Sequence, residues 1–218
     1  CHNITGPAVC GPNVTDMTQT YYDCRKLTGS PVCGDKVTNM SGTYVYCYGI
    51  TGDAACGNNV VDMYQAYYGC YNLTGQPACG NSVTSMHDTY CECRNLTGQP
   101  VCGPNVTTMF RTYYNCENLT GSPVCGDNVV DMFRTYWNCH NVTGPAVVGV
   151  NVGNASCAYD KCPNIGVNAY FFSSKLSGKQ AIEGTFGGRP LNASNMLKLY
   201  VPINSNTFNS CLRTNKYS

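Results

Sequence analysis

The stretch NVTTMFRTYYNCENLTGSPVCG (Asn105–Gly126) decides the fold, because nearly the same letters return every 23 residues. Seven units begin at Cys1, Cys24, Cys47, Cys70, Cys93, Cys116 and Cys139, and an eighth start falls in phase at Cys162. No insertion interrupts the period between Cys1 and Lys161. Strict spacing is typical of a stacked solenoid, since a coil that gained a residue would lose register with its neighbours. Positions within a unit are numbered as slots 1–23 from its first cysteine.

The fixed slots predict the inside of each coil. Slots 4 to 10 alternate apolar or small residues with polar ones, which predicts a short strand with one buried face. Proline in slot 8 lacks a hydrogen-bond donor, so strand pairing is expected to be interrupted there. Slots 11 to 13 carry turn chemistry. Slots 14, 17 and 21, mostly Val, Met and Tyr, lie three to four residues apart and predict one face of a helical or 3₁₀ segment.

Two units carry a family resemblance, NVTTMFRTYYNCENLTGSPVCG (Asn105–Gly126) and NVVDMFRTYWNCHNVTG (Asn128–Gly144). They resemble leucine-rich repeats of the BspA type, where Val-Thr-x-Ile, an aromatic pair, Cys and Leu-Thr recur with the same period. Val-Thr-x-Met, Thr-Tyr-Tyr and Cys-x-x-Leu-Thr fill those roles here, although Val-to-Cys is one residue shorter and Leu-to-Val one longer. The second Cys and the Gly-x-Pro also differ. The resemblance implies a leucine-rich-repeat-like solenoid over residues 1–161, and a role in adhesion at bacterial surfaces or in phage fibres.

Residues 162–218 are predicted to form an irregular capping region that covers the end of the stack. Asn168–Ser174 and Leu197–Ile203 are rich in aromatic and branched residues and predict strands. Lys175–Asn195 is rich in glycine and predicts a loop, and Ser205 is a candidate cap for a short helical turn. The alternative is a separate ligand-binding tip in this region.

Composition excludes several classes of protein. Only 11% of residues are charged and the net charge is +1, against about 25% charged residues in an average globular protein. The sequence has no basic stripe of the kind that nucleic-acid-binding proteins carry, so a nucleic-acid partner is not expected. No apolar run approaches the roughly 20 residues that span a bilayer. Since solenoid ends usually carry a distinct cap and Cys1 starts in phase with the repeat, we expect an excerpt of a longer chain.

The 17 cysteines allow two interpretations. A cysteine-rich secreted chain is usually a disulfide framework. Here most cysteines belong to slots 1 and 10 among apolar neighbours, and buried free cysteine behaves as a small apolar residue, so we favour two ladders of reduced thiols. Cys91, Cys157 and Cys211 lie outside the ladders, and a bridge between Cys157 and Cys162 stays open. The spacings lack the paired C-x₂-C sets of a zinc site, so no metal is expected.

No motif indicates catalysis or a cofactor. His2 and His140 occupy slot 2, which also accepts Arg, Tyr and Glu and is therefore predicted to be exposed. No phosphate-binding or dinucleotide-binding fingerprint is present, and no pair of carboxylates has separated acid and base roles. We predict a protein that is not an enzyme. The alternative, an enzyme with its site in the loop Lys175–Asn195, would rest on Lys175, Lys179, Glu183 and Arg189.

Slots that vary while the core slots stay fixed are predicted to lie on the surface. Slots 18 and 22 are often aromatic, and arginine follows the last two slot-18 rings. An exposed aromatic column with arginine is typical of a protein hot spot or a sugar-stacking surface; the alternative is that these rings pack under a neighbouring segment. The candidate binding residues are Tyr64, Phe110, Arg111, Phe133, Arg134 and Trp137.

These observations predict a non-catalytic extracellular adhesion or receptor-binding module, located at a cell or virion surface. Its partner would be a host or cell-surface protein or glycan, held by variable side chains on a rigid scaffold, which keeps the ordering cost of binding low. The alternative is a structural subunit of a filament or phage fibre that associates end to end, because head-to-tail contacts that do not close produce fibres.

Overall fold

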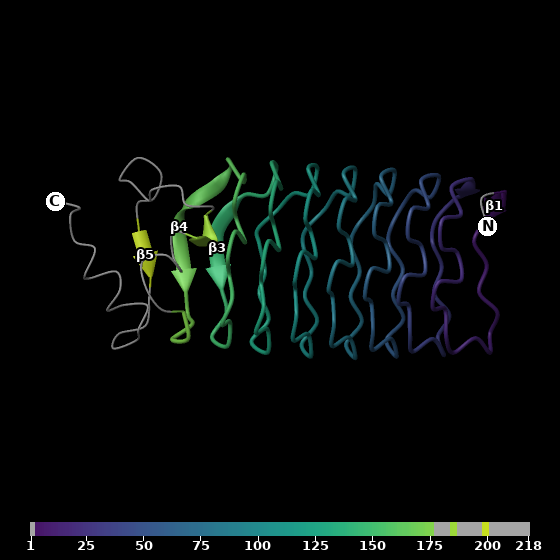
Figure 1. Cartoon of the computed structure of the whole chain (residues 1–218), viewed down its shortest axis with the longest axis horizontal. Helices are drawn as coiled ribbons and strands as arrows, with labels where there is room; N and C mark the ends of the chain where they lie inside the picture. The colour runs from purple at the N-terminus through teal and green to yellow at the C-terminus, as the bar shows by residue number, and fades with distance from the viewer. Residues whose placement is uncertain (1–2, 177–183, 187–197, 201–218) are drawn as a thin grey trace.

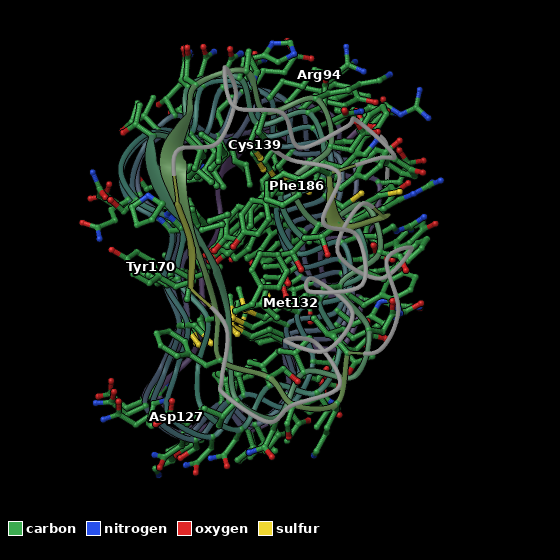
Figure 2. All side chains as sticks on the ribbon, turned by 90° about the vertical axis from the view of Figure 1, so that its left-hand side faces the viewer. Arg94, Asp127, Met132, Cys139, Tyr170 and Phe186 are labelled. Atoms are coloured by element: carbon green, nitrogen blue, oxygen red, sulfur yellow. The ribbon has the colours of Figure 1, made fainter. Side chains whose placement is uncertain are left out.

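The computed structural model describes residues 3–176, 184–186 and 198–200. Figure 1 shows the chain winding as successive coils that lie side by side along the longest axis of the molecule. Viewed along that axis in Figure 2, Met132, Cys139 and Phe186 lie inside the coils, whereas Arg94 and Asp127 lie on the outer rim. Within the described residues, no helix is long and apolar enough to cross a membrane.

Short parallel strands join neighbouring coils. β1 (Gly6–Pro7) pairs with β2 (Leu27–Thr28), and a second sheet has the order β3 (Gly144–Val148), β4 (Ile165–Phe171), β5 (Lys198–Tyr200). Strands therefore form where slots 4 to 10 predict them, but most are reduced to bridges. Proline in slot 8 removes a ladder donor, and glycine in slot 6 has a positive φ in most coils, which bends the chain out of the strand. A second column of parallel bridges joins slot 16 of successive coils, from Asp16 to Asn154.

The wall formed by slots 17 to 23 is a chain of turns, so the expected helical or 3₁₀ segment is wrong. In the fifth coil, the N–H groups of Met109, Arg111, Tyr113 and Asn115 each donate to a carbonyl of the next coil at 2.9 Å. Between them, the N–H groups of Thr112 and Tyr114 donate to the carbonyl three residues earlier in the same coil, and that of Phe110 donates to Thr108 Oγ1. Arg111 and Asn115, in slots 19 and 23, have φ values of 48° and 59°. Left-handed residues at every fourth position exclude a right-handed helix.

The core is a set of columns that run along the stack. Cys in slot 1, Leu or Ile in slot 4, Val in slot 14, Met in slot 17 and Tyr in slot 21 are fully buried in the middle coils. The slot-21 rings stack from Tyr21 to Tyr159, with centroids 5.4–5.6 Å apart and planes within 12° of parallel. Each coil thus contacts chiefly the coil before it and the coil after it, as in repeat proteins generally.

Each slot-21 tyrosine crosses the core and binds the opposite wall of its own coil. The hydroxyl of Tyr90 accepts the N–H of Ala78 at 2.9 Å and donates to the Ala78 carbonyl at 2.7 Å. The same pair of bonds recurs in seven coils, between slot 21 and slot 9. Slot 8 is proline in four of these coils and alanine in the other three, so the tyrosine hydroxyl satisfies the slot-9 backbone whether or not proline precedes it.

Every cysteine that the structure describes is a free thiol, including Cys157 and Cys162. The buried slot-1 thiols donate to the slot-21 carbonyl 26 residues earlier, as in the 3.0 Å bond from Cys116 Sγ to the Tyr90 carbonyl. In slot 10, the sulfur accepts the slot-11 N–H of the next coil, as Cys56 does from Gly80 at 3.2 Å. A disulfide would remove these donors and acceptors, which favours the reduced ladders.

The buried thiols predict a loss of stability in alkali. Burial raises the pKa of Cys56 to about 11 and those of Cys47, Cys79 and Cys125 to about 12, against about 8.5 for an unfolded thiol. Above pH 8.5 the unfolded chain therefore releases protons that the folded chain retains, and each pH unit costs about 1.4 kcal/mol per such thiol until its folded pKa is passed. The urea midpoint should stay level from pH 7 to about 8.5 and fall steeply above it. A midpoint that is unchanged at pH 11 would contradict this account.

Described residues beyond Lys161 continue the stack for another coil. β3 and β4 pair in parallel, the Tyr159 N–H donates to the Thr185 carbonyl at 2.9 Å, and Phe186 stacks on Tyr159 with centroids 6.0 Å apart. β4 overlaps the predicted strand Asn168–Ser174 but begins and ends three residues earlier, and β5 lies within the predicted strand Leu197–Ile203. The predicted helical turn after Ser205, and most of the loop Lys175–Asn195, lie outside the described residues. The boundary at residue 161 and the capping role stay predictions.

Candidate binding face on the turn wall

The slot-18 side chains of four successive coils form one continuous stack on the turn wall. Tyr64 and His87 have ring centroids 5.1 Å apart, His87 and Phe110 4.4 Å, and Phe110 and Phe133 5.0 Å. Tyr64 is 40% exposed and the other three are half-buried. These rings contact one another along the stack and form an aromatic column that is only partly exposed among the described residues. Their role as a binding site stays a prediction.

The two arginines of the candidate site lie beside this column in slot 19. The guanidinium carbon of Arg111 is 5.5 Å from the Phe110 ring centroid, and that of Arg134 is 5.0 Å from the Phe133 centroid. Both distances are within the range of a cation–π interaction. The positive φ of slot 19 turns each arginine back toward the ring of slot 18 in its own coil.

A buried carboxylate holds Arg111. Asp88, 1% exposed and one coil earlier in slot 19, accepts bonds of 2.7 and 2.8 Å from Nε and Nη2 of Arg111. Burial alone would raise the pKa of Asp88, but the nearby His87 ring and the hydrogen-bonded Arg111 guanidinium outweigh it and the pKa is lowered. The same carboxylate raises the pKa of Arg111. This bidentate ion pair fixes the position of the Arg111 side chain beside the slot-18 rings.

A second stack in slot 22 flanks the first. Tyr114 and Trp137 have ring centroids 4.5 Å apart and planes 5° from parallel. Lys161 and Asp160 belong to the coil after that of Trp137. Lys161 Nζ lies 4.2 Å from the centroid of the Trp137 ring, and Trp137 Nε1 donates to Asp160 at 3.1 Å. Tyr64, Phe110, Arg111, Phe133, Arg134 and Trp137, together with His87 and Tyr114, are called the aromatic–arginine patch below.

The stacking decides which part of each ring a ligand can reach. Phe110 has a ring on both faces, and Trp137 has Tyr114 as one neighbour and the Lys161 ammonium as another. A sugar binds an aromatic side chain through the ring face, whereas the edge of a ring carries positive partial charge. The patch therefore offers mainly ring edges and guanidinium groups, which favours a polar or acidic protein surface over a stacked sugar.

Unsatisfied polar atoms gather in the same place. Among the described side chains, the buried nitrogen and oxygen atoms without a hydrogen-bond partner are His87 Nδ1, Asn115 Oδ1 and Arg134 Nε. All three come from slots 18 to 23 of three successive coils. Buried polar atoms are nearly always paired in native proteins, so each exception requires an explanation. Their clustering sets this stretch of the turn wall apart from the rest of the described surface.

The sequence identified six members of the patch but missed two. His87 was not among the candidate residues, although its position in slot 18 places it between Tyr64 and Phe110. Tyr114 was not among them either, although it shares slot 22 with Trp137. Reading each slot as a column along the stack, instead of each residue along the chain, would have found both. The pairing of Asp88 with Arg111 could not be predicted in this way, because the residue type in slot 19 varies from coil to coil.

Among the described residues, no group of three or more His, Cys, Asp or Glu side chains is placed so that it could hold a metal ion. His87 Nδ1 lies 3.3 Å from Asp88 Oδ2, and Asp88 is already held by Arg111. No protein-family model, curated protein or solved structure matches the chain. The resemblance to BspA-type repeats therefore stays a prediction.

Proposed function

We propose that the chain is a leucine-rich-repeat-like solenoid whose function is binding without catalysis. It would serve as an extracellular adhesion or receptor-binding module, in a bacterial surface protein or a phage fibre. The stack of coils, the parallel bridges and the fixed core columns support the solenoid. The mostly turn-like walls and the near absence of helix differ from the strand-plus-helix coil that the sequence predicted.

The aromatic–arginine patch carries the proposal. It combines aromatic rings and arginine, the residue types enriched in binding hot spots. Backbone bonds fix the patch from coil to coil, as in the 2.9 Å bond from the Arg111 N–H to the Phe133 carbonyl. A ligand would therefore meet side chains that are already ordered, which lowers the entropy cost of binding.

The test is binding of the fluorescently labelled chain to cultured bacterial and epithelial cells, measured by flow cytometry. Replacing Phe110, Phe133 and Trp137 together by alanine is expected to weaken binding at least about tenfold, because single hot-spot truncations cost 2 kcal/mol or more. The matched control replaces Asn58, Asn81 and Asp127, which are exposed in slot 12, and should bind as the parent does.

Circular dichroism of both variants shows whether the stack is retained. Treating the cells with protease or with glycosidase beforehand separates a protein receptor from a glycan receptor. If no cell type binds the parent chain, or if the folded patch variant binds as well as the control, the proposed function is wrong.

A structural subunit of an extracellular filament or phage fibre is the second candidate. One observation favours it: bonding between coils has a direction, since slots 17, 19, 21 and 23 donate to the following coil and the even slots accept. Surfaces of this kind join head to tail and extend without closing. A filament subunit would lengthen with concentration in electron microscopy, whereas an adhesion module would stay as discrete particles.

A further inference from the structure

Three of the four described arginines have a carboxylate partner. Arg25 Nε lies 2.6 Å from Asp23 Oδ1, and Arg94 Nη2 lies 2.9 Å from Glu92 Oε2. Arg111 is held by both oxygens of Asp88. Charged residues are few in this chain, and these arginines are paired with carboxylates. An arginine without a carboxylate partner is therefore an exception that requires an explanation.

Arg134 is this exception. No ion pair among the described residues includes Arg134, and its Nε is buried without a hydrogen-bond partner. In slot 19 its neighbours along the stack are Arg111 before it and Cys157 after it, so the column supplies no acid at hydrogen-bond distance. Charge without a partner in a half-buried position costs free energy, and an incoming anion would recover part of it.

Two nearby carboxylates, Asp131 in the same coil and Asp160 in the next, bind other groups. Asp131 Oδ1 accepts the Phe133 N–H at 2.8 Å and the Asn154 amide at 3.1 Å. Asp160 Oδ2 accepts the Trp137 indole N–H at 3.1 Å. Within the part of the chain that the structure describes, no carboxylate forms an ion pair with Arg134.

The surroundings of Arg134 narrow the chemistry of that partner. The guanidinium carbon lies 5.0 Å from the Phe133 ring centroid, and the positive charge of Arg134 reaches the Tyr114 hydroxyl strongly enough to oppose the rise that burial causes in its pKa. Asn115 Oδ1, in the preceding coil, is an acceptor without a donor. Asn115 Oδ1 and Arg134 Nε are both buried, so a ligand would bind Arg134 through the terminal nitrogens of its guanidinium, and a carboxylate is the group that matches them best.

We propose that Arg134 is the anchor of the aromatic–arginine patch and that the ligand is an acidic polypeptide segment, whose Asp or Glu carboxylate binds Arg134. The ring edges beside it favour carbonyl and carboxylate oxygens, and the covered ring faces disfavour an acidic sugar. This inference rests on the proposed function and names the partner class of the same patch.

The chain reports on this site itself, because Trp137 is its single tryptophan. Titration with poly-L-glutamate at low salt is expected to change Trp137 fluorescence in a saturable manner, and the affinity should fall as salt screens the charges. Arg134→Gln should weaken binding at least about tenfold. The matched variant Arg25→Gln, which removes the same charge from a distant coil, should bind like the parent.

Three results would overturn the inference. The first is that poly-L-glutamate shows no saturable binding. The second is that Arg25→Gln and Arg134→Gln lose the same amount of affinity. The third is that hyaluronan, an acidic glycan, binds in a manner that depends on Arg134 while poly-L-glutamate does not bind. Cell binding that depends on Phe110, Phe133 and Trp137 but survives Arg134→Gln would leave the proposed function standing and refute the acidic segment alone.

Discussion

Replacing Tyr90 by phenylalanine is expected to lower the free energy of unfolding by about 2 to 3 kcal/mol, because a shielded backbone group without a partner costs about 1–3 kcal/mol. The substitution keeps the ring and its stacking on Tyr67 and Tyr113, but it removes the oxygen that serves both the N–H and the carbonyl of Ala78. Proline in slot 8, Pro77, cannot supply an alternative ladder bond beside it.

Urea unfolding followed by circular dichroism measures the effect. Tyr64→Phe is the matched control, because Tyr64 is 40% exposed. Removing its hydroxyl should change the free energy of unfolding by less than about 0.5 kcal/mol. Tyr90→Ala removes the ring as well and should cost at least about 3–5 kcal/mol more than an exposed substitution. Equal stability of Tyr90→Phe and Tyr64→Phe would show that the cross-core bonds do not hold the slot-9 wall.

Replacing Gly80 by alanine is expected to destabilise the chain by about 3 kcal/mol, at the upper end of overpacking in a close-packed interior. A Cβ at Gly80 would collide with the backbone carbonyl oxygen of Gly57 in the preceding coil. That oxygen belongs to main chain and cannot rotate away, so the two coils would have to separate. The collision would also strain the 3.2 Å bond from the Gly80 N–H to Cys56 Sγ.

Gly11 provides the matched control, because it occupies the same slot in the first coil. A Cβ there meets only the Val14 side chain at 3.6 Å, an ordinary contact. Gly11→Ala should therefore be neutral or should stabilise by about 0.4–1 kcal/mol through the unfolded state. Thermal unfolding of the two variants in parallel decides the point. A similar melting temperature for both would mean that the coils are not held in close backbone contact at slot 11.

The sequence predicted the period, the coil boundaries and the core columns, because burial acts on side-chain type and the fixed slots hold one type each. It predicted the turn wall wrongly. Val, Met and Tyr spaced three and four apart suit a helix face, but left-handed residues in slots 19 and 23 give the same spacing in a chain of turns. Gly42 in slot 19 and Gly69 in slot 23 were the residues that could have indicated left-handed backbone at these slots. The other coils carry residues such as Arg, Gln and Tyr there, so the indication is weak in the sequence.

The candidate site was predictable as a set of columns but not as an arrangement of atoms. Slot numbers place Phe110 next to Phe133 because identical slots stack. They do not show that ring faces are covered, that Asp88 neutralises Arg111, or that Arg134 has no acid. These depend on side-chain rotamers and on bonds between coils, which no spacing rule encodes.

The restriction of contacts to neighbouring coils bears on how such a chain changes through inheritance. A duplication or deletion of 23 codons would add or remove one whole coil and create no new type of junction, because the same Tyr, Cys and Met columns meet on either side. Recombination between repeats would therefore lengthen or shorten the row of outward side chains in single steps. Insertions of any other size would break the register, so selection would preserve the period while the outer columns diverge.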